Sequence, residues 1–237
     1  MIQLAFDLPR RSALGRADFL VSDSNATALG WIDRWPAWRS PALVLHGPPG
    51  CGKTHLAHLW CARASARILA GEELDEARLP TVLAALLAEA NPRIAIDDAD
   101  RAAARALLHL HNFCLAERGS LLLTARSSPG SWVVALDDLR SRLRAAGAVE
   151  IGVPDDALLG AVLVKHFADR QLHVAPTVIV YLIAHIERSF AAAAAAVAAL
   201  DAASLSGGRP VTIALARKLM PDPPPQPLPP DSESAVT

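Results

Sequence analysis

One stretch of this sequence has the residue types and the spacing of a phosphate-binding loop. Residues 47–54 read Gly-Pro-Pro-Gly-Cys-Gly-Lys-Thr and match the pattern G-x-x-x-x-G-K-[ST]. Glycines let such a backbone curl until its N–H groups face a phosphate chain. The lysine would reach the outer phosphates, and the threonine hydroxyl would bind Mg²⁺. The predicted nucleotide-binding residues are Gly47, Pro48, Pro49, Gly50, Cys51, Gly52, Lys53 and Thr54.

A pair of acids, Asp97 and Asp98, closes an apolar run that begins at residue 93. If that run is a parallel strand beside the phosphate loop, Asp97 would hold Mg²⁺ through its water shell, together with Thr54. Asp98 would then orient or deprotonate an attacking water. Acids are also common at helix N-termini, which is the alternative interpretation. The phosphate loop favours the catalytic one, because such a loop is normally accompanied by an acid-bearing strand.

Apolar residues alternate near the N-terminus, at Leu4, Phe6 and Leu8. In an extended chain these side chains point to one side. The segment is therefore either an edge strand packed on its own protein, or a peptide that inserts alternate side chains into a groove of a partner. The periodicity alone leaves both possibilities open.

Strand and helix patterns alternate up to residue 154, which predicts a parallel sheet covered by helices on both faces. From residue 155 onward only helical patterns remain, and they predict a small helical domain. The proline-rich segment from Pro221 is expected to be disordered or partly polyproline II. The predicted strands are 42–46, 67–70, 93–97, 120–124 and 149–153. The predicted helices are 26–35, the stretch after residue 54, 80–90, 101–118, 137–144, 155–170, 176–187, 190–206 and 211–219.

Composition limits the classes of function. The 237 residues are 52% hydrophobic and carry a net charge of −1, so a sizeable core is available and no strong direct binding to DNA or to an acidic membrane is expected. Three cysteines without metal-ligand spacing fit a reducing compartment. The first ten residues lack the apolar core of a signal peptide, and no run approaches the roughly 18 apolar residues of a membrane span. A cytoplasmic location is therefore expected.

These motifs together resemble the AAA+ ATPases of the DnaA branch, the bacterial replication initiators. The resemblance covers about residues 17–219. A helix-turn-helix domain that reads DNA is not present in this sequence, which favours the short, Hda-type members of the branch. The residues that carry the resemblance are Phe19–Val21 with Asn25-Ala26, Gly52–Leu56, Ile96–Ala99, Leu121–Thr124 with Pro129, and Leu139–Leu143.

The resemblance implies an α/β fold of the AAA+ P-loop NTPase type, with a parallel sheet flanked by helices and a small C-terminal helical lid. It implies ADP or ATP with Mg²⁺ as the ligand and adds His55 to the nucleotide-binding residues. The implied domains are a clamp-binding peptide, an α/β nucleotide-binding domain, a helical lid and a disordered tail, at residues 1–16, 17–154, 155–219 and 220–237.

Two partners follow from the resemblance. Residues 3–8, Gln-Leu-Ala-Phe-Asp-Leu, are similar to the family's peptide for the sliding clamp, the β subunit of DNA polymerase III, with Gln3, Leu4, Phe6 and Leu8 as its contacts. Arg142 matches the arginine finger that acts in trans at a neighbour's nucleotide, here the initiator DnaA, although a surface arginine in a basic helix is the alternative. A homo-oligomer is also possible.

The sequence departs from the family at two positions that normally contact the γ-phosphate. The sensor I acid falls at Arg126, and the sensor II arginine falls at Ala191, with Arg188 one turn earlier. Weak intrinsic ATP hydrolysis is therefore expected. The predicted function is a regulator of replication initiation that stimulates ATP hydrolysis by DnaA. The alternatives are a self-standing ATPase, such as a helicase loader or a DNA-dependent motor, and a nucleotide-free adaptor.

Overall fold

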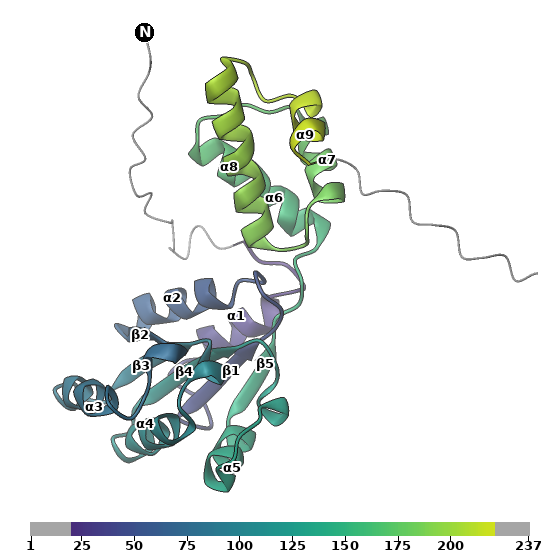
Figure 1. Cartoon of the computed structure of the whole chain (residues 1–237). Helices are drawn as coiled ribbons and strands as arrows, with labels where there is room; N and C mark the ends of the chain where they lie inside the picture. Colours follow the sequence, from purple (N-terminus) through teal and green to yellow (C-terminus); the bar gives the residue numbers. More distant parts are fainter. Residues whose placement is uncertain (1–19, 221–237) are drawn as a thin grey trace, which may run out of the picture. The chain divides into compact units, whose positions relative to one another are not determined.

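The structure is a computed structural model that describes residues 20–220. The chain divides between Leu158 and Leu159 into a sheet-containing unit and a helical unit, coloured purple to teal and green to yellow in Figure 1. The N-terminal peptide and the proline-rich tail of the sequence analysis lie outside the described residues, apart from residue 220.

Five short apolar runs form the sheet of the first unit. The strands are β1 (Ala42–His46), β2 (Arg67–Ala70), β3 (Arg93–Asp97), β4 (Ser120–Ala125) and β5 (Gly147–Glu150). Their order is β2-β3-β4-β1-β5, and every neighbouring pair is parallel. The predicted parallel sheet is therefore confirmed. Because parallel strands end at a common edge, the residues that follow β1, β3 and β4 lie side by side.

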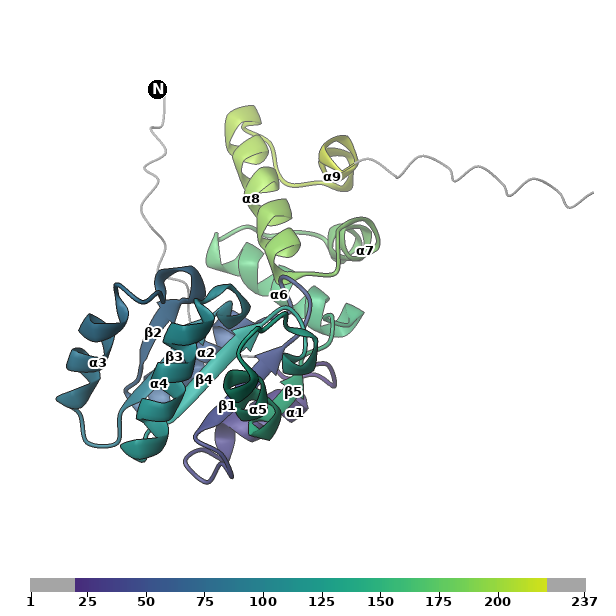
Figure 2. The same ribbon diagram turned by 60° about the horizontal axis from the view of Figure 1, so that its bottom comes forward.

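Helices cover both faces of this sheet, as Figures 1 and 2 show. One face carries α1 (Ala26–Asp33) and α2 (Lys53–Ala64), and the other carries α3 (Leu79–Leu87), α4 (Ala104–Ala116) and α5 (Asp137–Ala145). Each face of the sheet has its own hydrophobic core, because successive side chains of β1 point to opposite faces. Leu43 and Leu45 pack with α1 and α2, while Val44 packs with the other three helices.

A tryptophan cluster joins α2 to the segment around α1. Trp60 on α2 is fully buried, with Trp38 stacked on it at 5.5 Å and Trp35 edge-on at 6.1 Å between ring centroids. The indole N–H of Trp35 donates to Ser120 Oγ at the start of β4. These ring contacts and this hydrogen bond hold α2, the segment around α1 and the start of β4 together.

Several element boundaries differ from the predicted ones, most clearly at the start of α4 and in β5. The helix predicted to start at residue 101 starts at Ala104, because Asp98 is left-handed (φ 53°) and the short turn η3 (Ala99–Arg101) comes first. The strand predicted at 149–153 is β5, at 147–150. Beyond its last residue, the N–H of Ile151 still donates to the His46 carbonyl at 2.7 Å.

The helical unit consists of α6 (Asp156–Asp169), α7 (Pro176–His185), α8 (Phe190–Gly207) and α9 (Ile213–Leu219), close to the predicted ranges. α8 begins where the Ser189 hydroxyl accepts from the Ala192 N–H, and it ends at Gly208, which is left-handed (φ 57°). The hydrophobic core of the helical unit includes Leu163, Phe167 and Val197.

One helix corrects the expectation that no part of the sequence approaches the length and apolar composition of a membrane span. Over the described residues, only α8 is long and apolar enough by length and composition to cross a membrane, with a mean hydropathy of 1.5. Its alanine run supplies that hydropathy. Because Ala193, Val197 and Leu200 pack in the core of the helical unit, the composition of α8 is weak support for a membrane span.

Candidate nucleotide-binding site

The predicted phosphate loop lies between β1 and α2, and its backbone needs glycine at three places. Gly50 and Gly52 have left-handed φ values of 71° and 103°. At Gly47 a Cβ atom would lie 2.2 Å from the Ile151 carbonyl oxygen. Gly52 is also the residue from which α2 starts, so the N–H groups of the first helical turn face the loop. This is the local geometry that binds phosphate at a helix N-terminus.

The Lys53 ammonium lies inside this loop. Nζ donates to the carbonyls of Gly47 at 2.9 Å and Pro48 at 2.8 Å, and the side chain is only 7% exposed. The Cys51 sulfur lies 3.8 Å from Nζ. Burial raises the pKa of the Cys51 thiol, partly opposed by Lys53, so Cys51 is a neutral packing group. The lysine is thus placed where it can exchange carbonyl oxygens for phosphate oxygens.

Three side chains from three elements meet at Asp97. The Thr54 hydroxyl on α2 donates to Asp97 Oδ2 at 2.9 Å, and the Thr124 hydroxyl on β4 donates to Oδ1 at 2.5 Å. Thr124 Oγ1 in turn accepts from the Asp98 N–H at 2.9 Å. A hydroxyl and a carboxylate at this separation are the oxygen donors that Mg²⁺ takes beside a nucleotide, so the residues fit the predicted ion.

Thr124 is a site residue that the sequence analysis missed. It is fully buried at the end of β4, where it follows three leucines. The available signal was a polar residue closing an otherwise apolar strand. A buried hydroxyl must find partners, and the adjacent strand β3 supplies them.

Asp98 reaches the same edge in an unusual backbone conformation. It is the only one of the two acids in the left-handed region (φ 53°), which costs energy for a residue with a Cβ. Gly71 lies directly against it, since a Cβ there would be 2.1 Å from the Asp98 carbonyl oxygen. The separate roles of Asp97 and Asp98 stay predictions.

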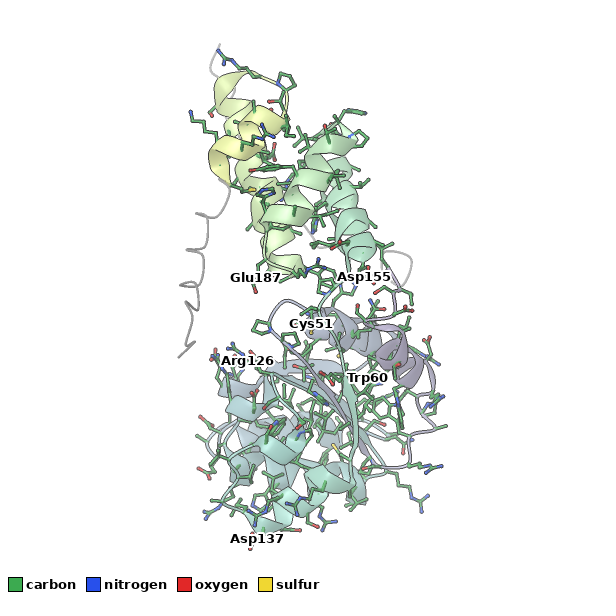
Figure 3. The ribbon with its side chains drawn as sticks, turned by 90° about the vertical axis from the view of Figure 1, so that its right-hand side faces the viewer. Cys51, Trp60, Arg126, Asp137, Asp155 and Glu187 are labelled. Atoms are coloured by element: carbon green, nitrogen blue, oxygen red, sulfur yellow. The ribbon has the colours of Figure 1, made fainter. Side chains whose placement is uncertain are left out.

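The residue after β4 is a cation. The Ala125 carbonyl accepts a hydrogen bond from the Gly47 N–H at 3.2 Å. The next residue, Arg126, therefore lies close to the start of the phosphate loop. Figure 3 shows Arg126 and Cys51 towards the same end of the sheet unit. Arg126 is exposed and has no ion-pair partner among residues 20–220. The other departure, Ala191, is an exposed second residue of α8, and Arg188 precedes its cap.

A second segment lies beside the loop, and sequence reasoning assigned it no site role. The Asn25 side chain is 2% exposed, donates to the Leu20 carbonyl and accepts from the Ser22 N–H, each at 3.0 Å. The Gly152 N–H donates to the Ser24 carbonyl, which holds residues 20–25 next to the chain that leaves β5. Residue 151, which precedes Gly152, lies against Gly47 of the phosphate loop, so this segment lies close to the loop.

Arg142 is not part of this site. α5 and α2 cover opposite faces of the sheet, and Asp137 at the start of α5 lies at the far end of the unit from Cys51 (Figure 3). His55 lies in the first turn of α2, with the other loop residues. The predicted clamp contacts Gln3, Leu4, Phe6 and Leu8 lie outside the described residues.

One cavity in the first unit lies beside η3 and α4. It has a volume of about 320 Å³ and is lined mainly by residues of η3, α4 and the segment from 127 to 139, including Trp132 and Leu139. None of the predicted nucleotide-binding residues lines it. The candidate site is therefore the loop and the residues that meet beside it, and this cavity is separate from it.

The order of the parallel strands, the phosphate loop with its acid pair and the helical unit that follows define the class as AAA+ P-loop proteins. Family models agree. The model for the ATPase family associated with various cellular activities (AAA) matches residues 43–114, and the model described as Hda, lid domain, matches residues 156–220. No curated protein sequence matches the chain significantly.

Solved structures agree on the fold. Domain III of the Thermotoga maritima initiation protein DnaA superposes with a TM-score of 0.72 at 16% identity, over 90% of this chain and 98% of that chain. AMPPCP-bound DnaA from Aquifex aeolicus gives 0.64 at 16% identity, over 81% and 66%. The T. maritima RuvB Holliday junction branch migration motor gives 0.62 at 17% identity, over 76% and 60%, so this chain spans about two thirds or less of these two. The chain is a DnaA/Hda-type AAA+ ATPase.

Proposed function

We propose that this protein regulates replication initiation by binding an adenine nucleotide and stimulating ATP hydrolysis by a DnaA-type initiator through Arg142. The position of Arg142 carries the proposal. It lies on α5, on the opposite face of the sheet from α2, so it is unavailable to the chain's own loop but available to a neighbour. The match of the helical unit to the Hda lid favours this type of regulator over a full initiator.

The chain's own nucleotide would be ADP or ATP held by Gly47–His55, with Mg²⁺ beside Thr54 and Asp97. The ion would supply charge neutralisation for the outer phosphates. Solved DnaA structures contain the ATP analogue AMPPCP, which supports the choice of an adenine nucleotide. With Arg126 and Ala191 at the two sensor positions, we expect the bound nucleotide to be mainly a structural ligand that turns over slowly.

In the partner's site, Arg142 would stabilise the negative charge that develops on the γ-phosphate. In related systems such an arginine accelerates hydrolysis by about 10³- to 10⁵-fold. A DnaA-type partner is supported by the lid match and by the DnaA-like fold. We further propose that Gln3, Leu4, Phe6 and Leu8 dock on the β sliding clamp, and that the protein acts in the cytoplasm.

The first test replaces the finger. Arg142→Ala should reduce stimulated ATP hydrolysis by DnaA at least about 100-fold, because the charge reaching the γ-phosphate is removed. The measurement is phosphate release by ATP-loaded DnaA in the presence of clamp loaded on DNA. Arg144→Ala is the matched control, since Arg144 is an exposed arginine on the same helix.

Retention of the chain's own ADP affinity in Arg142→Ala is part of the expected result. If the variant stimulated hydrolysis as well as the unaltered protein does, Arg142 would be a surface arginine and the proposal would be wrong.

A self-standing ATPase is the alternative, favoured by the intact hydrogen-bond set of Thr54, Asp97 and Thr124. Steady-state hydrolysis by the chain alone, with and without single-stranded DNA, separates the two. Rapid, DNA-dependent turnover would support the alternative, whereas slow turnover supports the regulator. A Lys53→Ala variant that keeps every activity would instead indicate a nucleotide-free adaptor.

A further inference from the structure

The three arginines of α5 have different surroundings. Arg140 and Arg144 are four residues apart, are exposed and share one face of the helix. Arg140 pairs with Asp137, one turn earlier. Arg142 lies between them in sequence and is only 39% exposed, with its Nε atom buried.

The Arg142 side chain lies beside α4. His111 on α4 is 4% exposed, and neither ring nitrogen has a hydrogen-bond partner among residues 20–220. Burial lowers the pKa of His111, and the nearby Arg142 charge lowers it further, against smaller opposing effects of Asn112 and Asp138. The ring is therefore neutral at neutral pH. Arg142 is thus close to an uncharged ring, and a carboxylate of α5 lies near both groups.

That carboxylate is Asp138, one turn earlier on α5. Its Oδ1 lies 3.3 Å from Arg142 Nε, at ion-pair distance although without the alignment of a hydrogen bond. Within residues 20–220, the two outer nitrogens of the guanidinium donate no hydrogen bond. A guanidinium held at its inner nitrogen keeps its outer nitrogens for a second anion, and the fork of its N–H groups matches two phosphate oxygens.

We propose that Asp138 is a positioning residue for Arg142: it pairs with the inner nitrogen of the guanidinium and leaves the outer nitrogens for the γ-phosphate of a partner. The inference rests on the proposed function, because it concerns how the finger is presented. Positioning matters since the long side chain would otherwise sample many rotamers, and a small misplacement of a reacting group lowers the rate strongly.

The test separates positioning from folding. Asp138→Asn keeps the size of the side chain and removes its charge. Because the pair is half-exposed, its loss should leave the thermal unfolding midpoint unchanged. We expect the maximal stimulated rate of DnaA ATP hydrolysis to fall about 10- to 100-fold, with the half-saturating concentration of this protein changed less than about twofold.

Two further variants of the full chain complete the experiment. Asp138→Glu keeps a carboxylate within reach of Nε and should restore most of the maximal rate. Asp137→Asn breaks the other ion pair of the same helix and should leave the rate unaltered, because Arg140 is exposed on a different face.

The outcomes are distinct. A normal or increased rate for Asp138→Asn, while Arg142→Ala is inactive, would overturn the positioning role and leave the finger in place. An equal loss for Asp137→Asn would also overturn it, since the effect would then be one of helix charge. Full activity of Arg142→Ala would instead overturn the proposed function itself.

Discussion

At the scale of single residues, the Asp97 carboxylate is held by two hydroxyls from different elements. Thr54 belongs to α2 and Thr124 to β4, so the group that would face a metal is fixed by both the loop helix and the sheet. Thr124 also accepts the Asp98 N–H, and this links the two acids to one buried hydroxyl. A network with every member satisfied orients its groups before a ligand arrives.

Removing this hydroxyl gives a prediction for stability. Thr124→Val keeps the shape of the side chain but leaves Asp97 Oδ1 with one partner fewer and the Asp98 N–H with none from Thr124. We expect the free energy of unfolding to fall by about 1–3 kcal/mol, measured by urea unfolding. The control is Thr81→Val, at an exposed position of α3. A loss below about 0.5 kcal/mol would show that the hydroxyl is replaceable.

At the scale of elements, α4 and α5 form the part of the first unit from which Arg142 projects. Leu107 and Leu110 of α4 and Leu139 and Leu143 of α5 belong to one hydrophobic core. Two polar residues of these helices, His111 and Arg142, are close enough that the Arg142 charge lowers the pKa of His111. The position of Arg142 therefore depends on helix packing as much as on its own ion pair.

His111 makes the stability of this pair of helices depend on pH. Its pKa is lowered in the folded state, so below its ordinary value of 6.5 the unfolded chain takes up a proton that the folded chain resists. The free energy of unfolding should consequently decrease as the pH falls from about 7.5 to about 5.5. His111→Gln should make this decrease smaller.

Urea unfolding followed by tryptophan fluorescence measures it, since Trp60 and its neighbours report on the first unit. His109→Gln, at an exposed position of α4, is the control. An unchanged pH dependence in His111→Gln would assign the effect to other groups. In the helical unit, burial together with Arg170 lowers the pKa of His166, which gives a second contribution of the same sign.

At the scale of the whole molecule, the features that indicate the family and the proposed function are divided between the two units. The first contains the phosphate loop, the acid pair and Arg142, and the second contains the match to the Hda lid. Both proposed partners would contact the first unit or the segment before it. Partner binding and nucleotide binding should therefore be separable by substitution.

The N-terminal segment gives the corresponding prediction. Changing Gln3 and Leu4 to alanine should lower affinity for the sliding clamp at least about tenfold, because the anchor and one apolar contact are removed. Affinity for ADP should stay the same. Surface plasmon resonance against the clamp and ADP titration calorimetry measure the two quantities. An unaltered clamp affinity would contradict clamp binding by this segment and would favour the alternative, an edge strand packed on its own protein.

The sequence by itself determined the class of fold and the phosphate loop. Both depend on residues that are neighbours in the chain: the apolar run of β1, helical spacing along α2 and glycines at φ values that other residues avoid. The same holds for the acid pair that closes β3, although its left-handed turn was not predicted.

Only the tertiary structure decided which residues meet. Thr124 and Asp97 are 27 positions apart, and they touch because β3 and β4 are neighbours in the sheet. Arg142 lies beside His111 and away from the loop because α4 and α5 cover the other face. Local patterns specify elements, whereas strand order and the choice of face depend on packing between distant segments, which no short stretch of sequence contains.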